Sequence, residues 1–221
     1  MRMTPRYVDN VNIMLAPKPE RTYHHGDLRR QLLVQAGQVL EREGPEGITL
    51  RGLARSLRVS HAAPGYHFSD RNALLIELAA EGHEMLEAAM VARQDSDPGI
   101  PPQVAIGEGY LDFALANPNR FRLMFAGIAD KGPSSSPTFA AAASRSFATL
   151  IQVTDSGAES APDPREWLSA WALVHGLATL WVDGALGAGW GPDDVGAFRD
   201  MATAILADHT RARRAAAAHR P

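Results

Sequence analysis

The stretch that decides the fold is residues 48–68, ITLRGLARSLRVSHAAPGYHF. Its first part carries apolar or small residues at spacings of three and four: Leu50, Leu53, Ala54 and Leu57. That spacing predicts a short helix with one apolar face, and Thr49 is a residue type that caps free backbone N–H groups at a helix start. A second short helix is expected after a tight turn, and the small side chain of Ala54 suits the place where two such helices cross.

The second short helix is predicted from His61 to about His67, with Ser60 as its capping residue. Such a helix, presented by a helix-turn-helix, is the element that enters the major groove of DNA. Pro64 counts against a regular helix here, because proline lacks a backbone N–H. Arg58 lies in the turn, where glycine would relieve a left-handed conformation that costs other residues roughly 1 kcal/mol.

Several short motifs in and beyond this stretch resemble the DNA-binding domain of the tetracycline-repressor (TetR) family. They are Thr-Leu-Arg-x-Leu-Ala at 49–54, Val-Ser at 59–60, His-Phe at 67–68 and Asp-Arg-x-Ala-Leu-Leu at 70–75. The run Ser-His-Ala-Ala-Pro at 60–64 resembles one branch of that family, which also carries this proline. The same branch has a Trp-x-x-x-His-Gly (WHG) signature near the C-terminus, and residues 171–176 match it.

The resemblance implies an all-α protein with an N-terminal three-helix helix-turn-helix domain and a C-terminal helical ligand-binding and dimerisation domain. TetR-like proteins pair through their last two long helices into a four-helix bundle. A twofold dimer holds its two reading helices about one DNA turn apart, roughly 34–36 Å, and therefore predicts an inverted-repeat operator. The expected function is a homodimeric repressor that a small effector releases from DNA, and activation instead of repression stays open.

Composition and length are those of an ordinary globular protein. The 221 residues are 45% hydrophobic and 21% charged, enough for one large or two small domains with a core. Cysteine is absent, which excludes a disulfide framework and a thiol nucleophile. No apolar run approaches the roughly 18 residues of a membrane span, and the N-terminus lacks a signal-peptide core, so we expect a cytoplasmic protein without a membrane partner.

Charge is unevenly distributed along the chain. Residues 1–71 hold 11 Lys and Arg against 7 Asp and Glu, a net of +4, whereas residues 72–221 hold 11 against 18, a net of −7. Such an imbalance can arise by chance on solvated faces. Combined with a helix-turn-helix pattern, a basic head on an acidic body favours a protein that binds DNA at one end.

The chain divides into three predicted segments: a flexible arm at 1–20, a helix-turn-helix domain at 21–70 and an all-helical regulatory domain at 71–215. About nine helices are expected in total. Beyond the two short ones, apolar periodicity places them at 27–43, 70–93, 103–116, 118–125, 138–154, 165–187 and 193–214. The core of the head is assigned to Leu32, Ala36, Val39, Leu40, Leu53, Ala54, Leu57, Val59 and Phe68.

The candidate DNA-contacting residues fall into two groups by their chemistry. Those expected to contact phosphates are Thr49, Arg51, Tyr66, His67 and Arg71. Those expected to face bases, after the capping Ser60, are His61, Ala62, Ala63 and Gly65, a set poor in hydrogen-bonding groups. Most of the family has tyrosine where this chain has Gly65, so Tyr66 either takes over that phosphate contact or the contact is missing.

The resemblance also implies a small-ligand pocket between the helix at 70–93 and the later helices. Its candidate wall residues are Met85, Tyr110, Phe113, Phe121, Met124, Phe125, Phe147, Trp171 and His175, although aromatic and Met stripes at helical spacing also fill ordinary cores. Such a wall favours an apolar or aromatic effector. His175 with Gly176 can instead mark close helix packing around a hydrogen-bonded imidazole.

Two rival functions have to be weighed. An enzyme is not expected, because the sequence has no Gly-rich phosphate loop, no nucleophile elbow, no His-Glu-x-x-His and no paired catalytic carboxylates. We therefore expect no cofactor and no metal. An architectural or constitutive dimeric DNA-binding protein without an effector stays open, and the sequence names neither the operator nor the effector.

Overall fold

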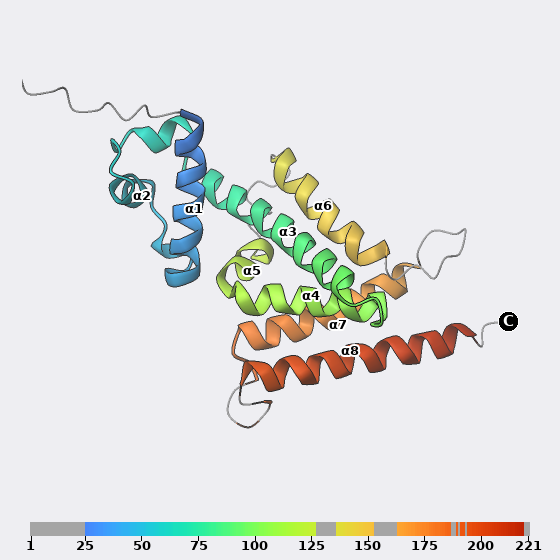
Figure 1. Ribbon diagram of the computed structural model, residues 1–221. Coiled ribbons are helices and arrows are strands. Elements are labelled where there is room, and N and C mark those ends of the chain that lie inside the picture. Colours follow the sequence, from blue (N-terminus) through green and yellow to red (C-terminus); the bar gives the residue numbers. More distant parts are fainter. Residues whose placement is uncertain are drawn as a thin grey trace, which may run out of the picture.

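The computed structural model describes residues 25–126, 136–152, 163–186, 189, 191–192 and 194–218. These residues form eight α-helices and two 3-10 helices, without a strand among them (Figure 1). The elements are α1 His25–Glu43, η1 Pro45–Gly47, α2 Leu50–Ser56, η2 Ala63–Tyr66, α3 Arg71–Ser96, α4 Pro102–Ala116, α5 Pro118–Phe125, α6 Pro137–Gln152, α7 Pro164–Val182 and α8 Val195–Ala218. The all-α class is confirmed, and the predicted arm at 1–20 lies outside the described residues.

The predicted head lies at the end of the molecule that carries α1 and α2 (Figure 1), and most of its buried residues belong to the same hydrophobic cluster as those of the body. Six of the nine assigned core residues are buried: Leu32, Ala36, Leu40, Leu53, Ala54 and Phe68. Val39, Leu57 and Val59 are partly buried against them. Thr49 caps α2 as expected, because its Oγ1 accepts a hydrogen bond of 3.0 Å from the Gly52 N–H.

The second short helix of the head differs from the prediction. Residues 61–62 form a turn, and only Ala63–Tyr66 is helical, as a 3-10 helix. Pro64 stands in its first turn and is buried, and a proline there removes an N–H that has no helical partner anyway. The helix starts too late for Ser60 to cap it, and its N-cap Ala62 makes no side-chain bond. The expected ninth α-helix is therefore a 3-10 turn.

The turn before it contains the left-handed residue that the sequence led us to expect. Arg58 has φ 56°, the only positive φ outside glycine in the described residues. The turn is closed by backbone bonds from Arg58 N to Arg55 O (3.1 Å) and from Val59 N to Ala54 O (3.0 Å). The segment between α2 and η2 is therefore fixed by the backbone despite an unfavourable residue.

The body is built on α3, which leads out of the head and packs against α4 and α6 (Figure 1). α4 lies centrally, with α7 and α8 also packed on it. The crossing of α3 and α4 is tight, since a Cβ added at Gly109 would lie 2.6 Å from the Ala89 carbonyl oxygen. Only glycine permits so close an approach.

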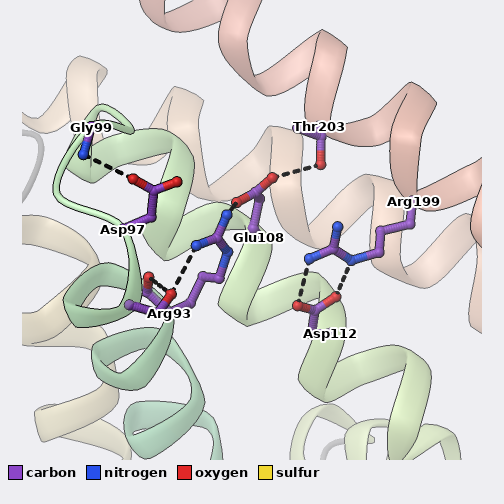
Figure 2. A network of polar contacts seen from close by, with 8 residues as sticks. Arg93, Asp97, Gly99, Glu108, Asp112, Arg199 and Thr203 are labelled. Atoms are coloured by element: carbon purple, nitrogen blue, oxygen red, sulfur yellow. Dashed lines mark hydrogen bonds and ion pairs between the residues drawn. The ribbon is translucent and has the colours of Figure 1, made fainter.

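A polar network ties α3, α4 and α8 together (Figure 2). Glu108 is buried on α4, where one carboxylate oxygen lies 2.6 Å from Arg93 on α3 and the other accepts a hydrogen bond of 3.1 Å from Thr203 on α8. One turn further, Arg199 on α8 donates two hydrogen bonds of 2.5 and 2.8 Å to Asp112. The paired geometry fixes the register of α8 on α4.

The helix boundaries otherwise follow the sequence closely, with one exception. α7 was expected to continue to residue 187, but it ends at Val182. Asp183 closes it, and Gly184 takes φ 70°, the left-handed conformation that commonly ends a helix. Among the described residues, none of the helices combines the length and apolarity that crossing a membrane requires.

Candidate functional site

The first candidate site is the outer surface of the head. Seven of the ten predicted DNA-contacting residues have exposed side chains or backbone: Thr49, Arg51, Ser60, His61, Ala62, Gly65 and Tyr66. Ala63 and His67 are half-buried beside them. Tyr66 stands out because 86% of its surface is exposed, although it is a large aromatic residue. The fold thus brings the start of α2 and the whole of η2 to one exposed end of the molecule.

Two features of this surface suit a polyanion. The Thr49 hydroxyl oxygen accepts the α2 capping bond, which leaves its O–H free to donate. No atom lies within 4 Å of a Cβ added at Gly65, so the backbone there is open to close approach. Arg51, in the first turn of α2, is exposed on the same end of that helix.

Arg71 has a different position from the one expected of a phosphate contact. Its guanidinium donates to the carbonyl oxygens of Ile48 (3.0 Å) and Pro45 (2.6 Å) and lies 3.4 Å from Glu46. These bonds hold the segment between α1 and α2 against the start of α3. Sequence motifs give the position of such an arginine but not the carbonyl groups that a loop turns toward it.

The second candidate site is a small cavity inside the body, between α3, α4, α5, α6 and α7. Four of its wall residues were predicted from the sequence: Tyr110, Phe125, Phe147 and Trp171. The other four were not: His83, Leu86, Ser146 and Leu150. Its volume is about 10 Å³, close to the minimum that one water molecule needs. A larger molecule enters this cavity only if side chains move.

His175 adjoins the cavity through an aromatic cluster. Its Nδ1 lies 2.8 Å from the Tyr110 hydroxyl, and its ring centroid lies 4.6 Å from that of Phe125 and 5.5 Å from that of Trp171. Burial lowers the pKa of His175 and raises the pKa of the Tyr110 phenol, so both groups are uncharged at neutral pH. The alternative interpretation of Gly176, close helix packing, finds no support among the described residues, because a Cβ there would meet nothing within 4 Å.

The remaining predicted wall residues do not line this cavity. Phe113, Phe121 and Met124 are buried in the core behind it, where Met124 packs on Gly82. Met85 points away from the body, with 41% of its surface exposed. A helix turns about 100° per residue, so Met85 stands roughly 200° around α3 from the cavity-facing His83.

His83 is the polar wall residue that sequence analysis missed. It is 3% exposed, and its Nδ1 lies 2.9 Å from the Ser146 Oγ. The Ser146 hydroxyl donates to the Ala143 carbonyl (3.0 Å), so it accepts from His83, whose Nδ1 carries the proton. The Nε2 atom is then left as an acceptor. Burial lowers the pKa of His83 to about 4, which keeps the ring neutral.

A sequence signal for His83 did exist. It lies four residues after Ala79 and three before Leu86, on the stripe of α3 that faces the body. Ser146 lies midway between Ala142 and Leu150, which are also buried, on the apolar stripe of α6. A polar residue within each of two apolar stripes indicated a buried polar pair, although not which residues would meet.

A polar clamp on α5 connects the body to the head. The buried Arg120 donates to the Leu78 carbonyl on α3 (2.9 Å) and lies 3.4 Å from Glu81 and 3.8 Å from Glu41 on α1. Glu41 in turn accepts from the backbone N–H groups of Asn119 (3.3 Å) and Arg120 (3.1 Å) at the start of α5. Phe121 and Phe125, on the same short helix, touch the aromatic cluster of the cavity.

No group of three or more His, Cys, Asp or Glu placed to hold a metal ion occurs in the described parts of the chain. The candidate sites are an exposed surface on the head, a small cavity in the body and a clamp between them.

Comparison with known proteins gives the family. Residues 104–206 match the model of the tetracyclin repressor-like C-terminal domain. A solved structure from Rhodococcus sp. RHA1, of a protein with unknown function, is 34% identical with a TM-score of 0.71, covering 87% of this chain and 98% of that one. The chain therefore carries the C-terminal domain of a TetR-family transcriptional regulator.

Other relatives of this TetR-family chain are more distant. The TetR family transcriptional regulator PfmR from Thermus thermophilus has the same fold, with a TM-score of 0.55, 20% identity and coverage of 80% of this chain and 94% of that one. An uncharacterised HTH-type transcriptional regulator, YobS of Bacillus subtilis, is 24% identical over 106 residues, 48% of this chain. The match spans 56% of that relative, just over half its length.

Proposed function

We propose that this TetR-family chain is a homodimeric repressor that binds an inverted-repeat DNA operator through its head and is released by a small, uncharged effector bound in the body. The observation that carries the proposal is the exposure of Thr49, Arg51 and Tyr66 on two contacting elements of the head, the start of α2 and η2. The WHG match at 171–176 further suggests the branch of the family that carries it.

On DNA, the phosphate contacts are assigned to the start of α2 and to Tyr66, and base contacts to η2. His61 is the one base-facing candidate with a strong hydrogen-bonding group and can reach a guanine edge. Ala62 and Ala63 suit contact with thymine methyl groups. Tyr66, which is exposed, is the best candidate to replace the family tyrosine absent at Gly65. Arg71 acts indirectly, because it fixes the loop that positions α2.

Support for a dimer comes from apolar surface on α7 and α8 that the described residues of the protomer leave exposed. On α7 it forms a stripe at spacings of four: Leu168, Ala172, Gly176 and Leu180. Leu168 is 48% exposed and Leu180 is 44% exposed, and Met201 on α8 is exposed as well. Small residues at the middle of the stripe allow two helices to approach closely. A second copy of the chain, related by a twofold axis, is the proposed partner.

Release by an effector would pass through α5. A molecule that enlarges the cavity has to displace Phe125, and Arg120 lies on the same short helix, where it is bonded to α1 and α3. Movement of α5 would therefore change the angle between head and body, and with it the distance between the two reading elements of the dimer. A coupling free energy of about 1–3 kcal/mol is sufficient for such a switch.

Sedimentation velocity on mixtures of the protein with a duplex selected from random sequences tests this proposal. Two chains per duplex, and an inverted repeat in the selected sequence, are expected. One chain per duplex, or a selected site without twofold symmetry, would overturn the homodimeric arrangement. The small volume of the cavity favours an alternative function, that of a DNA-binding dimer with no effector. This alternative is supported if no small molecule changes the affinity of the protein for the duplex.

A further inference from the structure

A second cavity lies in the body between α4, α6, α7 and α8. Its walls are mostly apolar and include Ile106, Val174 and Leu206, and its volume is about 30 Å³. At one side the walls contain polar side chains, among them His209 and Thr210. The Nε2 atom of His209 is buried and has no hydrogen-bond partner among the described residues. Burial, with Arg213 nearby, lowers the pKa of His209.

One side chain is shared by the walls of the two cavities. Leu150 on α6 belongs to the wall of both, and it is 5% exposed. On the first side it faces the neutral polar groups of His83, Ser146 and Tyr110. On the second side it faces the space that leads to His209. A leucine side chain makes no hydrogen bond, so no hydrogen bond opposes a movement of Leu150 that would join the two spaces.

The chemistry of the walls defines what fits. Among the described residues, neither cavity is lined by Asp, Glu, Lys or Arg. A charged molecule would lose its hydration there with no oppositely charged side chain in either wall, which is strongly unfavourable. A neutral hydroxyl or amide, in contrast, can form a hydrogen bond with the Nε2 of His83 or with the buried, unpartnered Nε2 of His209. The rest of a ligand would contact aliphatic and aromatic side chains.

We propose that the two cavities are the ends of one ligand site, with Leu150 between them. This site takes an uncharged amphipathic molecule that has a hydrogen-bond donor at one end and an apolar chain long enough to pass Leu150. This proposal rests on the proposed function, because the molecule would be the effector. Binding of the molecule to the protein does not itself require DNA. The first cavity, with its aromatic wall, holds the polar group of the ligand. The apolar chain of the ligand extends along α6 and α7 toward α8.

Primary n-alkanols from 1-butanol to 1-decanol are the probes, with the carboxylates and alkylammonium ions of equal length as charged counterparts. Binding to the full chain is followed by tryptophan fluorescence, because Trp171 lines the first cavity, and checked by calorimetry. Affinity should rise about fourfold per added CH2 while the chain finds apolar space. The octyl carboxylate and ammonium ions should bind at least tenfold more weakly than 1-octanol.

Leu150→Ala is the decisive variant, because it removes the dividing side chain. It should tighten the binding of 1-decanol at least tenfold while changing that of 1-butanol less than threefold. Leu111→Ala, an equal truncation at a fully buried site of α4 that lines neither cavity, should leave the ratio between the two alcohols unchanged. Adding Ala170→Phe to Leu150→Ala fills the second cavity and should cancel the gain for 1-decanol.

The proposal fails if Leu150→Ala shifts both alcohols by the same factor, if charged probes bind as tightly as 1-octanol, or if no alkanol binds to the folded protein. Failure of the proposed function looks different. In that case alkanols bind with the predicted dependence on chain length and on Leu150, yet the affinity for the selected duplex is unchanged by them or absent.

Discussion

At the scale of single residues, a histidine and a serine decide the character of the cavity. His83 on α3 and Ser146 on α6 are 63 residues apart in the sequence. Their hydrogen bond places two polar side chains in a cavity wall that is otherwise aromatic and aliphatic. A buried imidazole that stays neutral is costly to protonate. His83 therefore makes its own contribution to the pH dependence of the protein's stability.

Replacing His83 with Gln should remove that pH dependence. The imidazole has a pKa of 6.5 in the unfolded chain and about 4 in the folded one, so the unfolded chain binds more protons between these values and stability falls as the pH drops through them. Between pH 7 and pH 5 the wild-type protein should lose about 2 kcal/mol more than His83→Gln. Urea unfolding at both pH values measures the difference, and equal losses in the two proteins would contradict a neutral buried His83.

Arg51 gives a second prediction at this scale. As an exposed cation in the first turn of α2, it is expected to contact a phosphate and to release one counterion on binding. Arg51→Ala should weaken binding to all duplexes alike and reduce the slope of log K against log salt by about one. Fluorescence anisotropy over a salt series provides the slope. Arg145→Ala, on α6 in the body, is the matched loss of charge and should leave the slope as it is.

At the scale of elements, α5 connects the sites. Its eight residues include the buried Arg120, which bonds to α3 and lies near Glu41 of α1, and Phe125, which lines the cavity and packs against Phe121. Partial burial raises the pKa of Glu41 and Glu81, and the charge of Arg120 opposes that rise. A Cβ at Gly37 on α1 would lie 2.6 Å from the Arg120 guanidinium, so α1 fits closely against the clamp.

Arg120→Met should uncouple the head from the cavity. Loss of the bonds to Leu78 and the two carboxylates should lower the free energy of unfolding by about 2 kcal/mol, since hydrogen bonds from a charged, buried group are lost. The variant should still bind 1-octanol and the duplex, but the alcohol should no longer change the affinity for DNA. Arg122→Met, on the same helix but bonded to Asp183 at the end of α7, is the control and should keep the response.

Most elements of this fold could be predicted from the sequence, because their apolar stripes are regular and their ends carry caps or prolines. α4, α5 and α6 begin within two residues of the predicted starts, each with proline at or beside its first position. The second helix of the head was predicted too long, because periodicity does not show how far Pro64 shortens a helix. The end of α7 was missed because nothing in the pattern distinguishes Gly184 as left-handed.

The site was predicted less completely than the fold, for a physical reason. Four cavity residues were found because aromatic residues on inward stripes are visible in a sequence. Whether such a residue faces a cavity or packs in the core depends on how the helices cross. For this reason Phe125 lines the cavity, whereas Phe113 and Phe121, predicted with it, do not. The partners of Arg71 and Arg120 are backbone carbonyls and distant carboxylates, and sequence spacing does not indicate them.

At the scale of the whole molecule, the proposal needs two copies of the chain. Gly176 lies in the middle of the uncovered stripe of α7, and a side chain there meets nothing in the protomer. Gly176→Leu should therefore leave the protomer folded, with helix propensity improved by roughly 0.8 kcal/mol, while preventing close approach of a second α7. Sedimentation should show a dimer for the wild-type protein and a monomer for Gly176→Leu, with weaker DNA binding.

Ala148→Leu supplies the comparison for this variant. It adds a leucine to an exposed position of α6, away from the stripe, and should sediment as the wild-type protein does. A Gly176→Leu protein that stays dimeric would move the interface away from α7.

The central claim is that the exposed end of the head binds duplex DNA, and that two heads of a symmetric dimer bind one operator. Selection of bound duplexes from a random pool with the purified wild-type protein, followed by affinity measurement at several salt concentrations, tests it most directly. The expected result is one enriched inverted repeat, with half-sites about one helical turn apart and an affinity that falls steeply with salt. A pool that shows no enrichment, together with no salt-dependent affinity for any duplex, would contradict the claim.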